Sequence, residues 1–247
     1  MRVIKEAMKK LLDGKPVLIY DDRRRENEVD MVFYAPKVTP KHVAMMRNLA
    51  GGLICYVMPR SVGEILGLKY MEDILRSSGY EELSRKRLKY GDPPNFSLWV
   101  NHVDVETGIR DTDRAKTIRE LDKVVELVLE GEVEKARRKF YEEFVSPGHV
   151  PILLGRSLNE RKGHTELSIA LTQLVGLRPS LVIVEMLKEG GALDVDEARK
   201  IALRLNTILI EGSAIINEWS KLMTSRSVKG DGSSRLSYRE SHQPFIL

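Results

Sequence analysis

Short apolar runs alternate with amphipathic helical patterns along most of this chain. Runs such as 150–154 and 181–187 have the length of buried strands and are far shorter than the roughly 18 apolar residues that cross a bilayer. The chain has 247 residues, of which 42% are hydrophobic and 31% charged, so its composition is that of a globular protein with room for a core. The alternation predicts one domain of the α/β or α+β class and no membrane span.

The boundaries of the predicted elements follow from periodicity and from helix-end residues. Pro40 after Thr39 is typical of a helix start, and Gly14 is typical of a helix end. The polar segment 76–95 is long for a connecting loop, which favours a lid or a binding loop. We expect helices at 2–13, 39–49, 61–66, 164–175, 194–206 and 213–223, one broken helix or two at 114–144, and strands at 16–20, 31–35, 52–58, 96–103, 149–154, 181–186 and 207–210.

The basic excess of the chain is concentrated at its end. Of 40 Lys and Arg and 36 Asp and Glu residues, five basic and two acidic ones lie beyond residue 220, so residues 1–220 have a net charge of only +1. Residues 221–247 are rich in Ser and Gly, which predicts a mobile basic tail after a domain that covers 1–220. The domain has no basic stripe with interleaved aromatic residues, so nucleic-acid binding is not favoured.

Cys55 is the single cysteine of the chain, which excludes an internal disulfide and a Cys-rich zinc site. This favours a reducing, cytoplasmic location. Within its apolar stretch, Cys55 is interpreted first as a small core residue. The chain has no P-loop, no GxGxxG after a strand, no HExxH and no GxSxG, so ATP use, Rossmann cofactors and serine hydrolysis are disfavoured.

The first candidate site is the stretch RENEVD at 25–30, between two predicted strands. Its three carboxylates follow Asp21 and Asp22, so negative charge is crowded at one end of a hairpin. Such a cluster raises carboxyl pKa values or recruits a hard cation such as Mg²⁺ through oxygen ligands. The alternative is a solvated turn that is neutralised by the consecutive arginines 23–25, and composition alone favours that alternative.

The second candidate site is RKGHTE at 161–166, at the start of an amphipathic helix. A helix start offers free N–H groups and a favourable dipole, and Arg161, Gly163 and Thr165 are residue types that suit a phosphate. His164 could bind a metal or exchange protons. A Thr165 cap beside a surface histidine explains the pattern equally well, and Glu166 is interpreted as a favourable first-turn charge.

Three further features carry weaker signals. Glu185 lies in the apolar run 181–186, where an isolated buried charge costs several kcal/mol or more, so it needs a partner, a ligand or a proton. His149 follows Gly148 in a turn, a context that lets a ligand approach the backbone. The polar turn 107–114 leads into a helix and is also explained as a simple cap.

In this order, the stretches resemble one family, the 3,4-dihydroxy-2-butanone 4-phosphate synthases of riboflavin biosynthesis. The resemblance covers roughly residues 1–220 and is closest to the archaeal, single-function members. Its pieces are RENEVD at 25–30, GGLIC at 51–55, TGI and DRA within 107–115, SPGHV at 146–150, RKGHTE at 161–166 and the glutamate of VIVEM at 185.

The resemblance implies an α+β fold, a single domain with a mixed twisted sheet and helices around it in three layers. It implies a lyase that converts D-ribulose 5-phosphate into L-3,4-dihydroxy-2-butanone 4-phosphate and formate. The implied cofactor is Mg²⁺, with up to two ions per site and Mn²⁺ as a substitute. The implied partner is a second copy of the chain, in a homodimer with sites near the subunit interface.

Site residues are implied by the same resemblance. The metal would be held by Glu26 and His164. Glu185 and His149 would be tied most closely to proton transfer, with Glu28 and Cys55 also in the catalytic set. The substrate would contact Arg25, Glu26, Asp30, Arg161, Lys162, Gly163, His164, Thr165, Glu185, Thr107 and Asp21.

Two stretches depart from the family pattern. Val29 stands where glycine is common, which a larger residue can do if its φ is negative. Arg110 and Asp111 stand where a small pair is usual. The rival interpretations are a nucleotide- or RNA-binding module of related fold and a different metal-dependent phosphosugar enzyme, such as an aldolase or isomerase, which would release no formate.

Overall fold

A computed structural model describes residues 1–228, with side chains described to 225, and its centre is one mixed sheet. The strand order is β4-β5-β3-β6-β2-β1-β9; β3 is parallel to β5 and β1 to β9, and the other neighbours are antiparallel. A separate two-stranded ribbon joins β7 (Leu187–Lys188) to β8 (Gly191–Ala192). The strands of the main sheet are β1 (Val17–Tyr20), β2 (Val29–Tyr34), β3 (Cys55–Pro59), β4 (Phe96–His102), β5 (Phe144–Gly155), β6 (Leu181–Glu185) and β9 (Leu209–Glu211).

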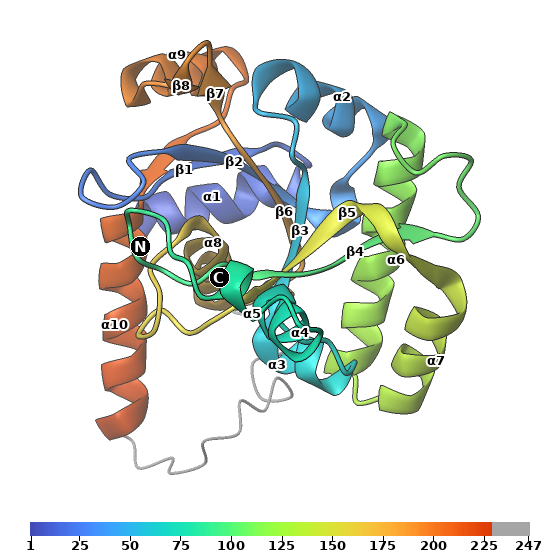
Figure 1. Ribbon diagram of the computed structural model, residues 1–247. Coiled ribbons are helices and arrows are strands. Elements are labelled where there is room, and N and C mark those ends of the chain that lie inside the picture. The colour runs from blue at the N-terminus through green and yellow to red at the C-terminus, as the bar shows by residue number, and fades with distance from the viewer. Residues whose placement is uncertain (229–247) are drawn as a thin grey trace.

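Helices cover both faces of this sheet (Figure 1). One face packs against α1 (Arg2–Leu12), α8 (His164–Val175) and α10 (Gly212–Val228). The other packs against α2 (Pro40–Leu49), α3 (Arg60–Ile65), α6 (Asp111–Leu129), α7 (Val133–Glu143) and α9 (Val195–Arg204). Strands covered on both sides are mostly apolar: β3 has no charged residue, and β2 and β6 have only Asp30 and Glu185. The expected three-layer α+β fold is therefore confirmed.

Local sequence explains the helix ends that matter for the site. Helix α2 begins after Thr39, whose N–H donates to His42 Nδ1 at 3.2 Å, with Pro40 in its first turn. Helix α8 begins after Gly163 and has Glu166 in its first turn, and it ends at Gly176, whose φ of 68° suits glycine. The expected helices at 2–13, 39–49 and 164–175 are confirmed to within one residue.

Several expected boundaries were wrong. The polar segment from 76 includes the end of α4 (Met71–Ser77) and all of α5 (Glu81–Ser84), neither of which was expected. Strand β5 begins at Phe144, five residues early, because residues 144 and 145 pair with the end of β4, whereas β3 and β9 begin later than expected. Helix α10 continues to Val228, past the expected boundary at 220, and the expected tail from 229 onward lies outside the described residues. Within residues 1–228 no helix is both long and apolar enough to cross a membrane.

Candidate active site

The loop between β1 and β2 is organised around the carboxylate of Asp21. Its two oxygens accept the backbone N–H groups of Glu26 and Glu28, each at 3.0 Å, and Arg25 Nη1 donates to it at 3.1 Å. Asn27 adopts a left-handed φ of 60° and accepts a hydrogen bond from Tyr20. The interpretation of this stretch as a solvated turn is therefore wrong, because Asp21 and Arg25 are largely buried in the loop that they hold together.

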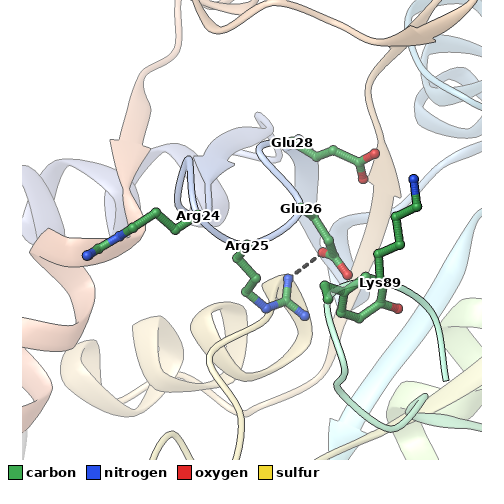
Figure 2. A pocket seen from close by; sticks show the side chains of 6 residues that line it. Arg24, Arg25, Glu26, Glu28 and Lys89 are labelled. Atoms are coloured by element: carbon green, nitrogen blue, oxygen red, sulfur yellow. Dashed lines mark hydrogen bonds and ion pairs between the residues drawn. The ribbon is translucent and has the colours of Figure 1, made fainter.

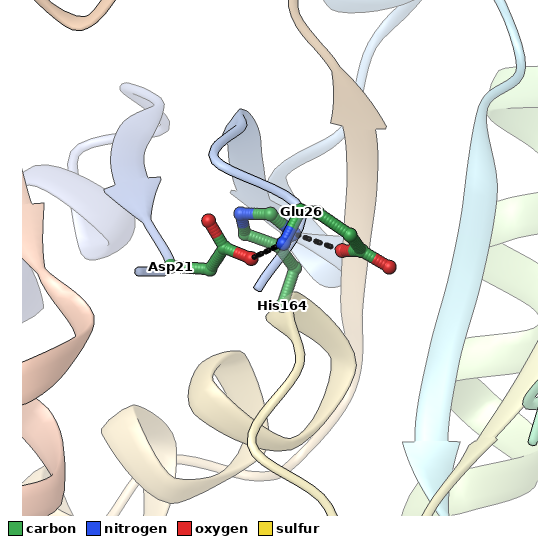
Figure 3. Close-up of side chains that lie close together, drawn as sticks. All are labelled: Asp21, Glu26 and His164. Carbon is green, nitrogen blue, oxygen red and sulfur yellow. Dashed lines mark hydrogen bonds and ion pairs between the residues drawn. The ribbon is translucent and has the colours of Figure 1, made fainter. Parts of the chain in front are cut away.

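His164 lies beneath this loop, at the first residue of α8 (Figure 3). Its Nε2–H donates to the carbonyl oxygen of Glu28 at 3.1 Å, so Nδ1 faces the acidic residues. Nδ1 lies 3.5 Å from Glu26 Oε2 and 3.4 Å from Asp30 Oδ1. Figure 3 shows Asp21, Glu26 and His164 converging, with the imidazole reaching the loop from the helix start. The alternative of a surface histidine is wrong, since His164 is 4% exposed.

The charges of this cluster shift one another's titration. Burial lowers the pKa of His164, but the neighbouring Asp30, Glu26 and Asp21 outweigh it and raise the pKa to about 9. For Glu26, burial raises the pKa, but the hydrogen bond to His164 and the charge of Arg25 outweigh burial and lower the pKa to about 2. Burial raises the pKa of Asp30 to about 7, with the nearby carboxylates adding to the effect of burial.

The donor set fits a divalent cation. Ligand atoms of Asp21, Glu26 and His164 all lie within 4.8 Å of one another, and the buried Asp30 Oδ1 has no hydrogen-bond partner. Mg²⁺ is commonly held by one or two carboxylates together with substrate oxygens and water. A histidine whose second nitrogen donates to a backbone carbonyl is the usual arrangement of a metal ligand.

One other group of donor atoms in residues 1–225 comes as close together: His102, Glu120 and Glu143. There the ammonium of Lys139 pairs with Glu120 at 2.9 Å and also with Glu143. Because a lysine already supplies the positive charge, this second group does not suit a cation as the first one does.

Two guanidinium groups lie beside the cluster. Arg161 Nη1 donates to Glu166 Oε2 at 2.7 Å, and Arg161 Nη2 lies 3.9 Å from Glu26 Oε1. A Cβ on Gly163 would lie 2.0 Å from Arg161 Nη1 and 2.7 Å from Arg25 Nη2, so the backbone of Gly163 lies against both groups and leaves no room for a side chain. Lys162 is exposed.

Glu166 does more than add a first-turn charge to α8. It is 1% exposed and accepts hydrogen bonds from four groups: Arg161 Nη1, the Gly163 N–H at 3.2 Å, Asn95 Nδ2 at 2.7 Å and the Arg156 N–H at 3.1 Å. The first turn of α8 is therefore tied to β5 and to the segment before β4. Thr165, whose cap role was the alternative, is buried in that turn, and Gly163 is the N-cap residue.

A pocket of about 360 Å³ opens beside Arg25 and Glu26 (Figure 2). In Figure 2 the Arg25 side chain turns toward the Glu26 carboxylate, whereas Arg24 points away from it. The other lining residues are Glu28, Lys89 and Tyr90, and the Arg25 guanidinium lies 5.4 Å from the centroid of the Tyr90 ring.

Sequence reasoning missed the contributions of Lys89 and Tyr90, and also of Asp92, whose Oδ2 lies 3.1 Å from Arg25 Nε. The only signal for them was the unusual length of segment 76–95. The expectation of a binding loop there agrees with these contacts.

Glu185 is the last residue of β6, and its Cα is paired with that of Asp30 on β2. The expectation of a carboxylate buried inside the strand is wrong, because Glu185 stands at the strand end with its side chain exposed. Partial burial and the charge of Glu26 still raise its pKa, and partial burial with Glu185 and Glu26 raises the pKa of Glu28. Both carboxyl groups are thereby moved toward neutrality, as proton transfer near pH 7 requires.

Cys55 opens β3 and is 5% exposed, so the core interpretation is confirmed. Burial, together with the charges of Asp30 and Glu185, raises the pKa of its thiol far above neutral pH. Burial thus favours the protonated form of this thiol, beside these two carboxylates.

The structure places His149 and Thr107 in a separate group. The His149 N–H donates to Asn101 Oδ1 at 2.8 Å, and Gly108 packs closely on the same Asn101 side chain. The backbone N–H of Thr107 donates to Asp113 at 3.1 Å. His149 is on β5, two strands from β6, or about 10 Å across the sheet. Within the described chain, no hydrogen bond or ion pair joins this exposed group to the cluster around Glu26.

The two departures from the family pattern have structural explanations. Val29 is buried in β2, paired with Tyr20 and outside the positive-φ set, so the condition for a larger residue is met. Asp111 begins α6 and forms an ion pair with Arg47 of α2 at 2.9 Å, while Arg110 is the preceding cap residue. The ion pair between Asp111 and Arg47 joins α6 to α2 on one face of the sheet.

The site combines a cluster of carboxylates and a histidine with two guanidinium groups, in a three-layer α+β domain. These features define a class of protein that can bind a phosphate-bearing small molecule next to a divalent cation. The family model for 3,4-dihydroxy-2-butanone 4-phosphate synthase matches residues 5–218. The chain belongs to this family.

Individual relatives agree with the family match. The enzyme of this name from Archaeoglobus fulgidus is 40% identical over 227 residues, which cover 87% of this chain and 93% of that protein. The one from Methanothermobacter thermautotrophicus is 37% identical, over 88% of this chain and 96% of that protein. A crystal structure is known of a 3,4-dihydroxy-2-butanone 4-phosphate synthase in complex with two magnesium ions. The sequence of that protein is 26% identical to this chain, and the two structures align with a TM-score of 0.69 over 89% of this chain and 97% of that one.

Proposed function

We propose that this site performs a Mg²⁺-dependent carbon–carbon lyase reaction. The enzyme converts D-ribulose 5-phosphate into L-3,4-dihydroxy-2-butanone 4-phosphate and formate, in riboflavin biosynthesis. The observation that carries the proposal is the buried contact of Glu26 and Asp30 with His164, beside the guanidinium groups of Arg25 and Arg161.

The residues divide into those that bind and those that move protons. Glu26 and His164 hold Mg²⁺, which when bound supplies Lewis-acid stabilisation of negative charge on substrate oxygens. Arg25 and Arg161 bind the phosphate, next to the backbone of Gly163. Their partners in binding the substrate are Asp21, Asp30, Lys162, Thr165 and Thr107.

Proton transfer belongs to the carboxylates at the end of the central strands. The raised pKa values of Glu185 and Glu28 favour these two carboxyl groups for accepting a proton from the substrate and returning it. Cys55, at the start of β3, is the third member of the catalytic set. His149 is the fourth member of the catalytic set and acts as a proton donor or acceptor from the β5 side.

A homodimer explains why His149 and Thr107 lie apart from Glu26 in one chain. Four exposed apolar side chains surround this group, on or beside β4 and β5: Trp99, Val103, Ile109 and Val145. Exposed apolar patches mark interaction surfaces, and a second copy seated here would bring the site near the interface. Sedimentation of Ile109→Asp tests this proposal: a monomer supports it, and a dimer unchanged from the wild type contradicts it.

The remaining parts of the proposal concern the setting of the reaction. Mn²⁺ substitutes for Mg²⁺, because carboxylate and water ligands suit both ions. The location is the cytoplasm, in agreement with a single buried cysteine.

Carbon-13 NMR of ribulose 5-phosphate labelled at C4 tests the reaction. The protein is incubated with substrate and Mg²⁺, with EDTA in a parallel sample. Labelled formate that appears only with the metal is the expected result. An isomerised sugar without formate would identify a different phosphosugar enzyme. An unchanged substrate with folded protein would contradict the lyase proposal and favour the binding-module interpretation.

A further inference from the structure

The carboxylate of Asp92 lies between the two guanidinium groups of the site. Its Oδ2 is 3.1 Å from both Nε and Nη2 of Arg25, and 3.7 Å from Nε of Arg161. Asp92 lies more than 60 residues from either arginine along the chain, so the contact depends on how the segment between α5 and β4 folds back over the site.

The two arginines are far more buried than the aspartate that they contact. The side chain of Arg161 is 8% exposed and that of Arg25 is 12% exposed, whereas that of Asp92 is 30% exposed. Asp92 stands in a loop after Gly91, whose φ is 81°, and before two prolines. The cationic site is therefore built into the domain, and the acidic group reaches it from a surface loop.

One carboxylate does not satisfy these guanidinium groups. Arg25 Nη2 and Arg161 Nε are buried and have no hydrogen bond of good geometry, although both lie within 4 Å of the same Asp92 oxygen. Buried N–H donors without partners are costly, and a phosphate offers more acceptor oxygens to a pair of guanidinium groups than a single carboxylate oxygen does.

We propose that Asp92 is an internal competitor for the phosphate group of the substrate: in the free enzyme it pairs with Arg25 and Arg161, and the phosphate must displace it to bind. The inference rests on the proposed function, which assigns these arginines to the phosphate. It adds a residue on the loop that sets the affinity of the site for anions.

Displacement has a measurable consequence for affinity. A site that is free for only a fraction of the time binds its ligand more weakly by that fraction. If Asp92 leaves the arginines free about one tenth of the time, its removal strengthens phosphate binding about tenfold. Inorganic phosphate is a suitable probe because it binds through its charge and oxygens without undergoing the reaction.

The test is isothermal titration of inorganic phosphate into the full-length wild-type protein, Asp92→Asn and Glu82→Gln, at one ionic strength and one Mg²⁺ concentration. Glu82 is exposed on α5 in the same segment, so Glu82→Gln removes the same charge without touching the arginines. Asp92→Ser is the second variant, and circular dichroism checks that each variant is folded.

Tighter phosphate binding by both Asp92 variants, by about tenfold, with Glu82→Gln equal to the wild type, supports the proposal. Unchanged or weaker binding by the Asp92 variants overturns it, and weaker binding would mean that Asp92 positions the arginines. An equal gain in Glu82→Gln also overturns it, because the cause would be net charge. These titrations need no turnover. They can therefore contradict the proposal for Asp92 while labelled formate is still produced, and they can support it while no labelled formate is produced.

Discussion

Asp30 and Glu185 stand directly opposite each other, as paired residues of the antiparallel strands β2 and β6. Like charges that face each other across two strands destabilise a sheet. Here one of the two, Asp30, is 2% exposed, and its Oδ1 has no hydrogen-bond partner. The register of two central strands thus concentrates negative charge next to His164, at a cost in stability that a purely structural sheet would avoid.

The first prediction is that Asp30→Asn stabilises the metal-free protein at pH 8. Burial raises the pKa of Asp30 to about 7, whereas an unfolded aspartate titrates near 4, so the folded state holds its proton more tightly. Stability from this group is complete below pH 4 and is lost as the pH rises to 7. The full shift corresponds to roughly 4 kcal/mol, and we expect a gain of about 1–3 kcal/mol because protonated His164 loses a partner.

Urea unfolding in EDTA at pH 8 and at pH 4 measures this effect. The gain should nearly disappear at pH 4, where Asp30 is protonated in the folded state and about half protonated in the unfolded state. Asp13→Asn, at the exposed end of α1, is the matched control. Lower stability of Asp30→Asn than of the wild type at pH 8 would contradict the prediction.

The second prediction concerns the metal. Mg²⁺ should raise the free energy of unfolding of the wild-type protein, by about 2.7 kcal/mol at a hundred times its dissociation constant, and EDTA should reverse the gain. Glu26→Gln and His164→Ala should lose most of this gain, because each removes a ligand. Thermal unfolding with and without Mg²⁺ measures it, with Glu6→Gln on α1 as control. A full Mg²⁺ effect in both ligand variants would place the ion elsewhere.

The third prediction is that Glu185→Gln folds normally and turns over at least about 100-fold more slowly. The side chain is exposed at the end of β6, so the amide costs little stability, but it can no longer exchange a proton. Formate release at saturating substrate measures the rate. Glu189→Gln, on the neighbouring β7–β8 turn, should keep the normal rate. A near-normal rate in Glu185→Gln would remove this residue from the mechanism.

The fourth prediction is that Glu166→Ala destabilises the protein by about 3–5 kcal/mol. The change leaves Arg161 Nη1 without its hydrogen-bond acceptor and removes an acceptor from Gly163, Asn95 and Arg156. Urea unfolding measures the loss, and Glu166→Gln, which keeps one acceptor oxygen, should lose less. Glu160→Ala, which removes a single exposed hydrogen bond, should cost under about 1 kcal/mol. Similar losses at 160 and 166 would contradict this role for Glu166.

The sequence by itself determined the features that depend on neighbouring residues. Pro40 and Gly14 mark helix ends because their backbone preferences act locally, and the apolar runs at 150–154 and 181–186 predict strands because burial on both faces demands them. The stretches around Glu26 and His164 were also recognisable as candidate sites, since both place charged or metal-binding groups beside a turn or a helix start. Short helices such as α4 and α5 have too few turns for a clear apolar period, and they were missed.

Only the tertiary structure decided which of these groups meet. His164 reaches the carbonyl of Glu28 across 136 positions of the chain, and Asp92 reaches Arg25 across 67. The pairing of Asp30 with Glu185, the exposure of Glu185 and the burial of Glu166 depend on strand register and on helix packing against the sheet. Such contacts are set by the packing of the whole domain, because the energy of a charge depends on its distance from other charges and on its exclusion from water, and neither is encoded in the spacing of a single motif.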